Sequence, residues 1–498
     1  MARLTVYNIV IGMIVAIGTF GYGYGFGVFI TSIGQPGFYK DFNLDHTAAT
    51  SKYTANVLGA VNALFAAGAA FGSLFQGWLA DWIGRKKALV VSALFSLIGA
   101  GWTAGSPYLA MLITIRILHG FGLGMLICLV PLYLTEVSPP HCRGLMSGMT
   151  VMGFGIGYVA VAWVSVATYY AENATLQWRL PLALACVGPL GLLVGIYFVP
   201  ESPRYLCWRG RHEEALQVIQ RLHRDPDDPT NSSAQAEFIQ IRAQVEKDKE
   251  QKSGYVRMFT KPSWRKRSLL VLFIMFASQA TGVNGIANYL VRIFGTLGLE
   301  GVMPLLVYAA FVACFTMDKF GRRRLFLIGF PALAVNLLIE AVLQREYLGT
   351  ANQAGNGAAV ACIFLFIVLF QFIDAPSFVW CAEIFPTTIR AKGIGLSMFA
   401  YFVGFITFST PGPLAFRNIT WRMYLIFMSF CIVCEAVVYF FVPETRGLPV
   451  EEMGTLFGDE VVMHMTLDGR GLVEKDTTEG VVMEQIEVVA AKGQEELV

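Results

Sequence analysis

Charge is scarce in this chain of 498 residues, because only 14% of them are Asp, Glu, Lys or Arg. Soluble domains usually contain about 25%, and a soluble fold of this size could not cover its surface with so few. The 37 basic and 35 acidic residues nearly cancel, to a net charge of +2, so no basic field indicates a nucleic-acid partner. The composition therefore excludes an ordinary soluble protein and a nucleic-acid-binding protein.

Several chemical signatures are also missing. No Gly-x-x-x-x-Gly-Lys-Ser/Thr loop, which binds the phosphates of ATP, is present, so the sequence does not indicate an ATP-driven pump. The 6 histidines show no metal-ligand spacing, and most of the 9 cysteines lie inside apolar runs rather than in a disulfide framework. We expect no enzyme activity, no catalytic residue, no metal site and no cofactor.

Apolar sequence is abundant. Hydrophobic residues make up 55% of the chain, and its mean hydropathy is +0.56. A membrane-spanning helix needs roughly 17–25 mostly apolar residues, and twelve runs approach that length. They cover about 7–33, 56–80, 88–105, 108–133, 146–168, 180–199, 269–294, 302–317, 325–343, 358–382, 393–415 and 422–442. The sequence predicts an all-α membrane protein with twelve transmembrane helices, embedded in a lipid bilayer.

These runs divide the chain into four parts. We expect an N-terminal six-helix bundle (1–199), a central loop (200–268), a C-terminal six-helix bundle (269–442) and an acidic tail (443–498). Amphipathic stretches at Glu213–Leu222 and Ala234–Lys247 predict helices in the loop. The tail has no long apolar run, and we expect it to be disordered or weakly helical.

Basic residues predict the orientation. With the N-terminus inside, 29 of the 37 lysines and arginines fall on the inner side and 7 on the outer side. The positive-inside rule then places both termini and the central loop in the cytoplasm, and we expect the plasma membrane as the location. Asn173 of the Asn-Ala-Thr sequon falls in an outer loop, so it is a candidate for glycosylation.

The two halves carry the same charged motifs in the same order. Asp81-Trp-Ile-Gly84-Arg85 is echoed by Asp318-Lys-Phe-Gly321-Arg322, Glu136…Arg143 by Glu383…Arg390, and Pro200-Glu201-Ser-Pro-Arg204 by Pro443-Glu444-Thr-Arg446. The offsets are 237, 247 and 243 residues, which indicates duplication. Because each half has six spans, both halves cross the membrane in the same sense, the parallel-repeat arrangement of a two-bundle transporter.

All these motifs fall at the cytoplasmic ends of predicted spans. Acids and arginines gathered there can make charge-assisted bonds that hold the bundles together while the outside is open. The alternative is that the charges are solvated and only mark topology. We predict a gate network of Asp81, Gly84, Arg85, Glu136, Arg143, Glu201, Arg204, Asp318, Gly321, Arg322, Glu383, Arg390, Glu444 and Arg446.

The motifs resemble those of a known family. Asp81…Arg85, Pro131-Leu-Tyr-Leu-Thr-Glu136, Pro200-Glu-Ser-Pro-Arg204, Gln279-x-x-Gly-x-Asn284 and Pro443-Glu-Thr-Arg-Gly447 are similar to the signatures of the sugar porters of the major facilitator superfamily, fungal members above all. The resemblance covers residues 8–453. It implies two six-helix bundles, alternating access, and a sugar or polyol as the solute.

The resemblance also implies a solute site on the seventh span. Gln279 and Asn284 match the family's amides, and Asn288 stands where the family usually has tyrosine. These three residues are spaced i, i+5 and i+9, and we expect them to lie on one side of a helix. Amides both donate and accept, which suits sugar hydroxyls. The alternative is that these amides join neighbouring helices.

Two differences between this sequence and the family pattern concern proton coupling. Proton-coupled sugar porters carry an acid in the first span, whereas the matching stretch here is Tyr22-Gly-Tyr-Gly25. Its partner arginine is present as Arg116, which would need another partner, and His119, Glu136 and Asp374 are the available groups. Arg116 and Asp374 are therefore our two intramembrane coupling candidates. Asp374 could carry a proton, accept a solute hydroxyl, or pair structurally with a neighbouring helix.

Two further departures concern the spans themselves. Val151 stands near the place of a fifth-span glutamine that many members use for sugar. The predicted eighth span has only sixteen residues between Gly301 and Asp318, reaching about 24 Å as a helix.

The sequence favours a sugar transporter, acting as a monomer, either as a facilitator or as a proton symporter. Two alternatives stay open. One is a non-transporting sugar sensor that signals through its cytoplasmic surface. The other is a carrier of a cyclic acid such as quinate.

Overall fold

The computed structural model describes most of the chain. The described residues are 5–33, 35–44, 52–139, 143–223, 231–249, 254–284, 322–347, 352–386, 388–411, 419–445, 457, 463–465 and 472–474. Asn288, Asp318, Gly321, Arg446 and the predicted span 302–317 lie outside them.

In the N-terminal half, all the secondary-structure elements of the described residues are helices. Its helices are α1 (Val6–Ile33), α2 (Pro36–Asp41), α3 (Lys52–Ile83), α4 (Arg85–Ala104), α5 (Leu109–Val137), α6 (Arg143–Tyr169), α7 (Ala174–Leu184) and α8 (Val187–Gly195), followed by the short 3-10 helix η1 (Ile196–Phe198). The predicted sixth span, 180–199, thus comprises the end of α7, α8 and η1.

The central loop contains α9 (Pro203–Trp208), α10 (His212–Leu222), α11 (Ser232–Lys249) and α12 (Tyr255–Thr260). The two helices predicted from amphipathic stretches are confirmed as α10 and α11. Their apolar faces meet in a small core of their own, which includes Leu206, Ile219, Ile241 and Val245.

The C-terminal half contains α13 (Pro262–Ala280), α16 (Arg322–Tyr347), α17 (Gln353–Glu383), α18 (Arg390–Ser409) and α20 (Arg422–Phe441). In the tail, β1 (Met463–Met465) pairs antiparallel with β2 (Leu472–Glu474) and β1 contacts α11. These six residues are extended, whereas the composition predicts a disordered or weakly helical tail.

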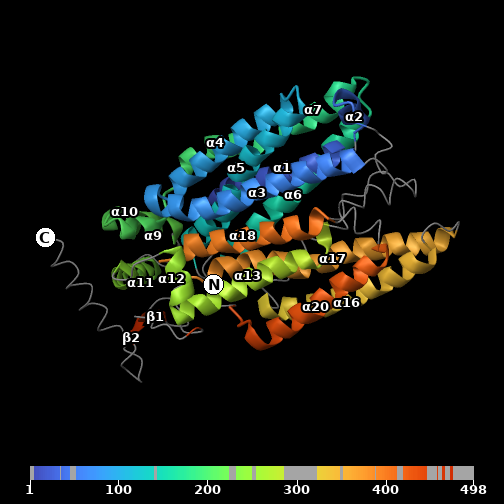
Figure 1. The fold of residues 1–498 in the computed structure, drawn as a ribbon. Coiled ribbons are helices and arrows are strands. Elements are labelled where there is room, and N and C mark those ends of the chain that lie inside the picture. The colour runs from blue at the N-terminus through green and yellow to red at the C-terminus, as the bar shows by residue number, and fades with distance from the viewer. Residues whose placement is uncertain are drawn as a thin grey trace.

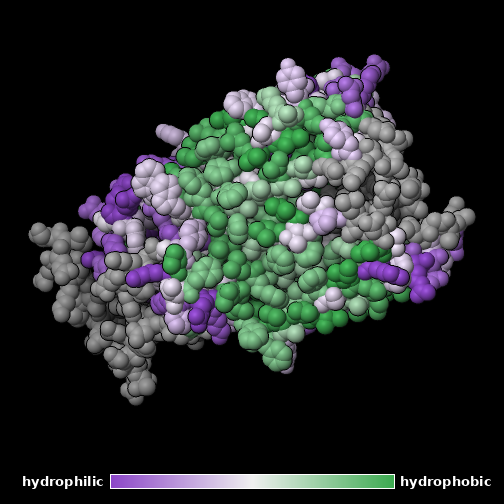
Figure 2. Space-filling model, viewed as in Figure 1, coloured by the Kyte–Doolittle hydropathy of each residue, from purple (hydrophilic) through white to green (hydrophobic). Residues whose placement is uncertain are grey.

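Ten helical segments of the described chain are long and apolar enough to cross a membrane. They correspond to the predicted spans one to six and nine to twelve. Figure 1 shows the N-terminal helices, blue to cyan, gathered in one bundle and the C-terminal helices, yellow to red, in a second. A broad hydrophobic belt runs across both, with polar residues at its two ends (Figure 2). The all-α, two-bundle membrane fold is confirmed.

The predicted seventh span is not one continuous helix. Helix α13 ends at Ala280, and Gly282 takes a φ of +89°, which residues with a side chain rarely adopt. A Cβ atom at Gly282 would also lie 2.2 Å from the ring of Phe427. The expectation that Gln279 and Asn284 share one side of a continuous helix is therefore wrong, because the helix breaks between them.

Small residues allow the helices of the N-terminal bundle to touch backbone to backbone. A Cβ atom at Gly72 of α3 would lie 2.2 Å from the carbonyl oxygen of Phe121, and one at Gly124 of α5 would lie 2.2 Å from that of Ala69. Each helix therefore offers a glycine to the other. Close approach of this kind gains dispersion energy where lipid supplies no hydrophobic drive.

We predict that Gly124→Ala destabilises the protein. The added methyl group would overlap backbone atoms of α3, at a cost of about 1–3 kcal/mol, which outweighs the gain of about 1 kcal/mol in helix propensity. Thermal unfolding of the purified protein measures the change. Gly59→Ala is the matched control, since a Cβ atom there meets nothing within 4 Å. Equal melting temperatures for the two variants would contradict the prediction.

Candidate functional site

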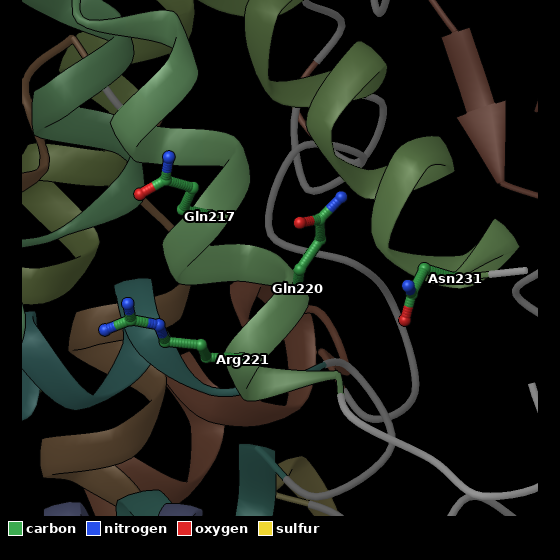
Figure 3. A pocket seen from close by; sticks show the side chains of 4 residues that line it. All are labelled: Gln217, Gln220, Arg221 and Asn231. Carbon is green, nitrogen blue, oxygen red and sulfur yellow. The ribbon is translucent and has the colours of Figure 1, made fainter. Parts of the chain in front are cut away.

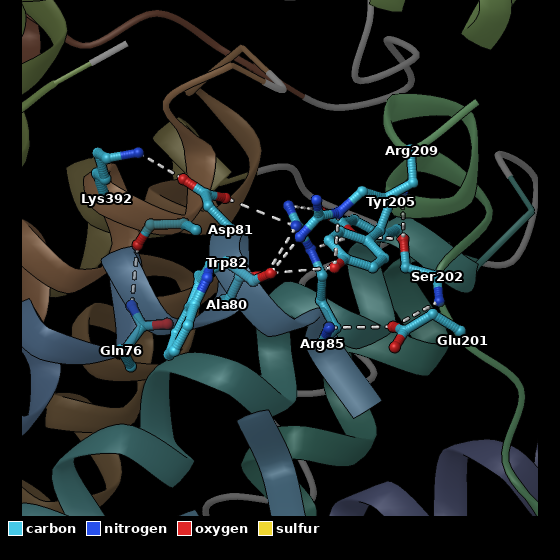
Figure 4. A network of polar contacts seen from close by, with 12 residues as sticks. Gln76, Ala80, Asp81, Trp82, Arg85, Glu201, Ser202, Tyr205, Arg209 and Lys392 are labelled. Atoms are coloured by element: carbon cyan, nitrogen blue, oxygen red, sulfur yellow. Dashed lines mark hydrogen bonds and ion pairs between the residues drawn. The ribbon is translucent and has the colours of Figure 1, made fainter. Parts of the chain in front are cut away.

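A buried ion pair joins α4 to α5 in the N-terminal bundle. Arg85 grips Glu136 with two bonds, Nε to Oε2 and Nη2 to Oε1, both 2.9 Å long. Asp81 lies 3.6 Å from the same guanidinium, and the Ser202 hydroxyl donates to Glu136 at 2.5 Å. A two-bonded arginine–carboxylate pair fixes orientation as well as distance. Figure 4 shows Arg85, Asp81 and Ser202 of this network.

The start of α4 is held by a second acid. Glu201 accepts hydrogen bonds from the backbone N–H groups of Arg85 and Lys86, at 3.0 and 3.1 Å, where the helix dipole favours a negative charge. Burial raises the pKa of this carboxyl, although those bonds and the Arg85 charge oppose the rise. Gly84 precedes the helix with a φ of +95°, and a Cβ atom there would lie 2.6 Å from Glu201. Glycine is therefore needed at this position for two reasons: the backbone has a positive φ, and a side chain would collide with the Glu201 carboxylate.

The C-terminal bundle repeats the main contacts of this arrangement, with one arginine–glutamate bond in place of two. Arg322 Nη2 lies 2.9 Å from Glu383, and the Thr445 hydroxyl donates to Glu383 at 2.8 Å. Glu444 accepts from the backbone N–H groups of Arg322 and Arg323, at 3.0 and 3.2 Å. The duplication inferred from the sequence therefore holds at the level of single hydrogen bonds. We call this end of the two bundles, with Arg85, Glu136, Arg322 and Glu383, the charged end.

These ion pairs lie within each bundle and do not cross between them. The sequence predicts a charge network that holds the two bundles together. In the structure, most of its described members instead form bonds within a single bundle. The ion pair that crosses in the described chain joins Asp81 of α3 to Lys392 of α18, at 2.5 Å. Gln76 adds a hydrogen bond to the Ala391 carbonyl at 2.9 Å, and the Tyr255 hydroxyl of α12 donates to the Leu74 carbonyl at 2.6 Å. The bundles are thus closed against each other at the charged end.

Lys392 is a residue that the sequence reasoning missed. It stands two positions after Arg390, which is the cation that the repeated Glu…Arg motif singles out. Arg390 is buried and donates from Nε to the Phe385 carbonyl at 3.1 Å, while its charge and that of Arg204 both act on Glu136. Arg143 begins α6. The remaining gate residues Asp318, Gly321 and Arg446 lie outside the described chain.

The predicted solute amides meet beside the helix break. Asn284 Nδ2 donates to Gln279 Oε1 at 2.5 Å, and Gln279 Nε2 donates to the Ser278 hydroxyl at 3.1 Å. Both amide residues are buried. The Gln279 side chain also reaches the Tyr401 hydroxyl of α18. Asn288, the third member of the predicted set, is not among the described residues.

Asp374 lies at the contact between the two bundles. It is 5% exposed, and next to it Ala375 packs against Val151 of α6, so the valine in the place of the fifth-span glutamine faces the other bundle. The carboxylate lies close enough to Tyr22, Tyr158 and Tyr401 for its charge to act on their hydroxyls. The tyrosines were not singled out from sequence, because aromatic residues are ordinary core fillers there.

Arg116 is stabilised by aromatic rings rather than by an acid. Its guanidinium lies 4.6 Å from the ring centre of Phe29 and 4.3 Å from that of Phe65, a double cation–π contact. Nη1 lies 3.5 Å from Nδ1 of His119. The other ring nitrogen of His119 lies 3.2 Å from where a Cβ atom of Gly25 would be. Of the three partners considered from sequence, His119 is the one found beside Arg116.

Another buried acid escaped the sequence analysis. Glu340 of α16 is buried and accepts from Gln344 Nε2 at 2.8 Å. A lone acid within the apolar run 325–343 was the signal that could have found it. In the N-terminal half, the exposed Asn173 caps α7 by accepting a hydrogen bond from the Thr175 N–H at 3.0 Å. The sequon therefore lies on the surface.

A pocket of about 280 Å³ lies in the central loop, lined by Gln217, Gln220, Arg221 and Asn231 (Figure 3). All four residues belong to α10 or to the residue before α11. None of them belongs to a membrane-spanning helix, so this pocket is separate from the buried amides Gln279 and Asn284 and from Asp374.

Comparisons with known proteins agree with this geometry. A family model described as "Sugar (and other) transporter" matches residues 11–457. The MFS-type transporter criB of Aspergillus cristatus is 33% identical over 466 residues, which cover 91% of this chain and 94% of that protein. The high-affinity glucose transporter of Kluyveromyces lactis is 29% identical over 489 residues, covering 92% and 86%.

The fold is that of a solved transporter. The structure of the major facilitator superfamily proton:xylose symporter XylE bound to 6-bromo-6-deoxy-D-glucose matches with a TM-score of 0.80 at 22% identity, covering 91% of this chain and all of that one. The chain is a multi-pass membrane protein and belongs to the sugar transporter family of the major facilitator superfamily.

Proposed function

We propose that the protein carries a neutral sugar or a related polyol across the membrane by alternating access. The observation that carries this proposal is the buried pair of amides, Gln279 and Asn284, beside a break in the helix at Gly282. Broken helices expose polar groups at the level where transporters bind their solutes. Relatives named as glucose and xylose transporters support the same solute class.

The proposed cycle follows from the contacts at the charged end. With α3 and α18 joined there, the opposite end is the one that opens to receive the solute. Binding between the bundles is followed by separation of Asp81 from Lys392 and release on the other side. The excess of basic residues in the inner loops supports a cytoplasmic position for the charged end and both termini. We propose the plasma membrane as the location. The proposed parts are the bundles at 1–199 and 269–442, the loop at 200–268 and the tail at 443–498.

We predict saturable uptake of at least one neutral monosaccharide in a host that lacks its own carriers. Radiolabelled hexoses, pentoses, disaccharides, polyols and quinate form the panel. Gln279→Ala should raise KM about tenfold, because one buried hydrogen-bonding group is lost, whereas Gln344→Ala in α16 is the matched control. Uptake of quinate with none of any sugar would favour the cyclic-acid carrier. Sugar binding without flux would favour the sensor.

We also propose facilitated diffusion rather than proton symport. The first span has Gly25 in the place of the coupling acid, and Arg116 is held between Phe29 and Phe65 with His119 beside it. That arrangement leaves the arginine without a carboxylate that could exchange a proton with solute binding.

The expected result is uptake that a protonophore leaves unchanged within about twofold, because no proton gradient drives a uniporter. Extracellular pH should stay constant when sugar is added. Sugar-evoked alkalinisation that disappears in Asp374→Asn would contradict the proposal and assign the coupling proton to that carboxylate.

For the gate, we predict that Lys392→Asp shifts the carrier toward the state open at the charged end. A partly exposed ion pair contributes about 0.5–1 kcal/mol, so the ratio of the two states should change about two- to fivefold. The measurement is the labelling rate of Ser73→Cys, since Ser73 is buried where α3 meets Gly395 of α18. The labelling of the parent chain is subtracted.

The charge-swapped double variant Asp81→Lys with Lys392→Asp should restore the slow labelling rate. Lys87→Asp, an exposed lysine on the same end, is the matched control for charge alone. Equal labelling in Lys392→Asp and Lys87→Asp would count against the role of the crossing pair.

A further inference from the structure

Two buried polar groups at the boundary between the bundles come from opposite halves of the chain. Tyr22 comes from α1 in the N-terminal bundle and Asp374 from α17 in the C-terminal bundle, and the carboxylate charge acts on the tyrosine hydroxyl. Tyr22 is fully buried, its ring stacked on Phe154 at 5.4 Å and edge-on to Phe402 of α18 at 6.4 Å. Aromatic rings therefore fix the position of its hydroxyl at the boundary between the bundles.

Neither group is satisfied by the protein. Among the residues that the structure describes, the Tyr22 hydroxyl and Asp374 Oδ1 have no hydrogen-bond partner, and both atoms are buried. Buried polar groups are nearly always paired, and an unpaired one is costly. The two side chains supply an O–H donor on one bundle and a carboxylate acceptor on the other, which suits a group that both donates and accepts.

No cation of the described chain forms an ion pair with Asp374. Its charge acts on the hydroxyls of Tyr22, Tyr158 and Tyr401, which are neutral groups. Arg116, the arginine within the predicted fourth span, is instead enclosed by the rings of Phe29 and Phe65. A second negative charge brought to this carboxylate would therefore meet no compensating cation.

We propose that Tyr22 and Asp374 form a cross-bundle subsite that binds hydroxyl groups of a neutral or cationic polyhydroxylated solute and excludes anionic ones. This inference rests on the proposed function and adds the charge class of the solute. A hydroxyl bound here accepts from Tyr22 and donates to Asp374. The solute thus connects one residue of each bundle, so its binding favours the state in which the bundles approach each other.

The test is ligand-induced thermal stabilisation of the purified full-length protein, which does not depend on transport. The panel contains glucose, xylose and myo-inositol as neutral ligands, glucosamine as a cation, and glucuronate and quinate as anions. We expect the wild type to be stabilised by at least one neutral ligand and by neither anion. Asp374→Asn should weaken neutral binding about tenfold and reduce the preference for neutral over anionic ligands by about tenfold or more.

Tyr22→Phe separates the two parts of the subsite. It removes the hydroxyl and leaves the charge, so neutral binding should weaken about tenfold while anions stay excluded. The matched controls are Tyr24→Phe, whose hydroxyl donates to the Pro181 carbonyl within the N-terminal half, and Glu340→Gln, which neutralises the buried acid of α16. Both should keep the wild-type preference. If Asp374→Asn does not fold, Tyr22→Phe still tests the hydrogen bond and the wild-type panel still tests the exclusion.

Each result has a definite meaning. Anion binding by the wild type as tight as neutral binding would overturn the subsite, and so would an unchanged preference in folded Asp374→Asn. In both cases sugar uptake by the wild type would leave the proposed function intact. A wild type that is stabilised by no ligand and shows no sugar uptake would overturn both.

Discussion

Each bundle depends on one buried arginine–glutamate pair, Arg85–Glu136 in the first and Arg322–Glu383 in the second. These pairs join neighbouring helices where the chain leaves the apolar belt, and a hydroxyl and a second carboxylate complete the hydrogen bonds around them. Breaking a buried pair by removing one partner typically costs about 3–5 kcal/mol, because a charge is left uncompensated. The pairs therefore keep each bundle rigid, which a carrier with two rocking halves requires.

The connection between the bundles is of a different kind. Its polar contacts among the described residues include the partly exposed ion pair Asp81–Lys392 and a few hydrogen bonds to backbone carbonyls such as that of Ala391. Contacts of this strength can form and separate within one cycle, while the internal pairs stay intact. Strong bonds within bundles and weak ones between them are what allow two rigid bodies to alternate between two states.

Several buried polar side chains also lie near the boundary between the bundles. Gln279 and Asn284 bond to each other beside the break at Gly282, whereas the Tyr22 hydroxyl and Asp374 Oδ1 are buried without a hydrogen-bond partner among the described residues. Arg116 shows the opposite solution, since two aromatic rings take the place of an acid. The intramembrane cation is thus stabilised in the absence of solute, and the intramembrane acid at the boundary is not.

Much of this molecule was determined by its sequence alone. Long apolar runs specify membrane helices because every backbone group must be satisfied inside lipid, and the repeat of Asp-x-x-Gly-Arg specifies two equivalent halves. The same reasoning located the amides and singled out Arg116 and Asp374. It failed at Gly282, because one glycine within an apolar run does not reveal a positive φ. It also failed at Lys392 and Tyr22, whose roles depend on which residues of the other bundle lie opposite. Local composition decides which segments enter the membrane, but only the packing of the two bundles decides which charges meet across the boundary, since those contacts join residues hundreds of positions apart.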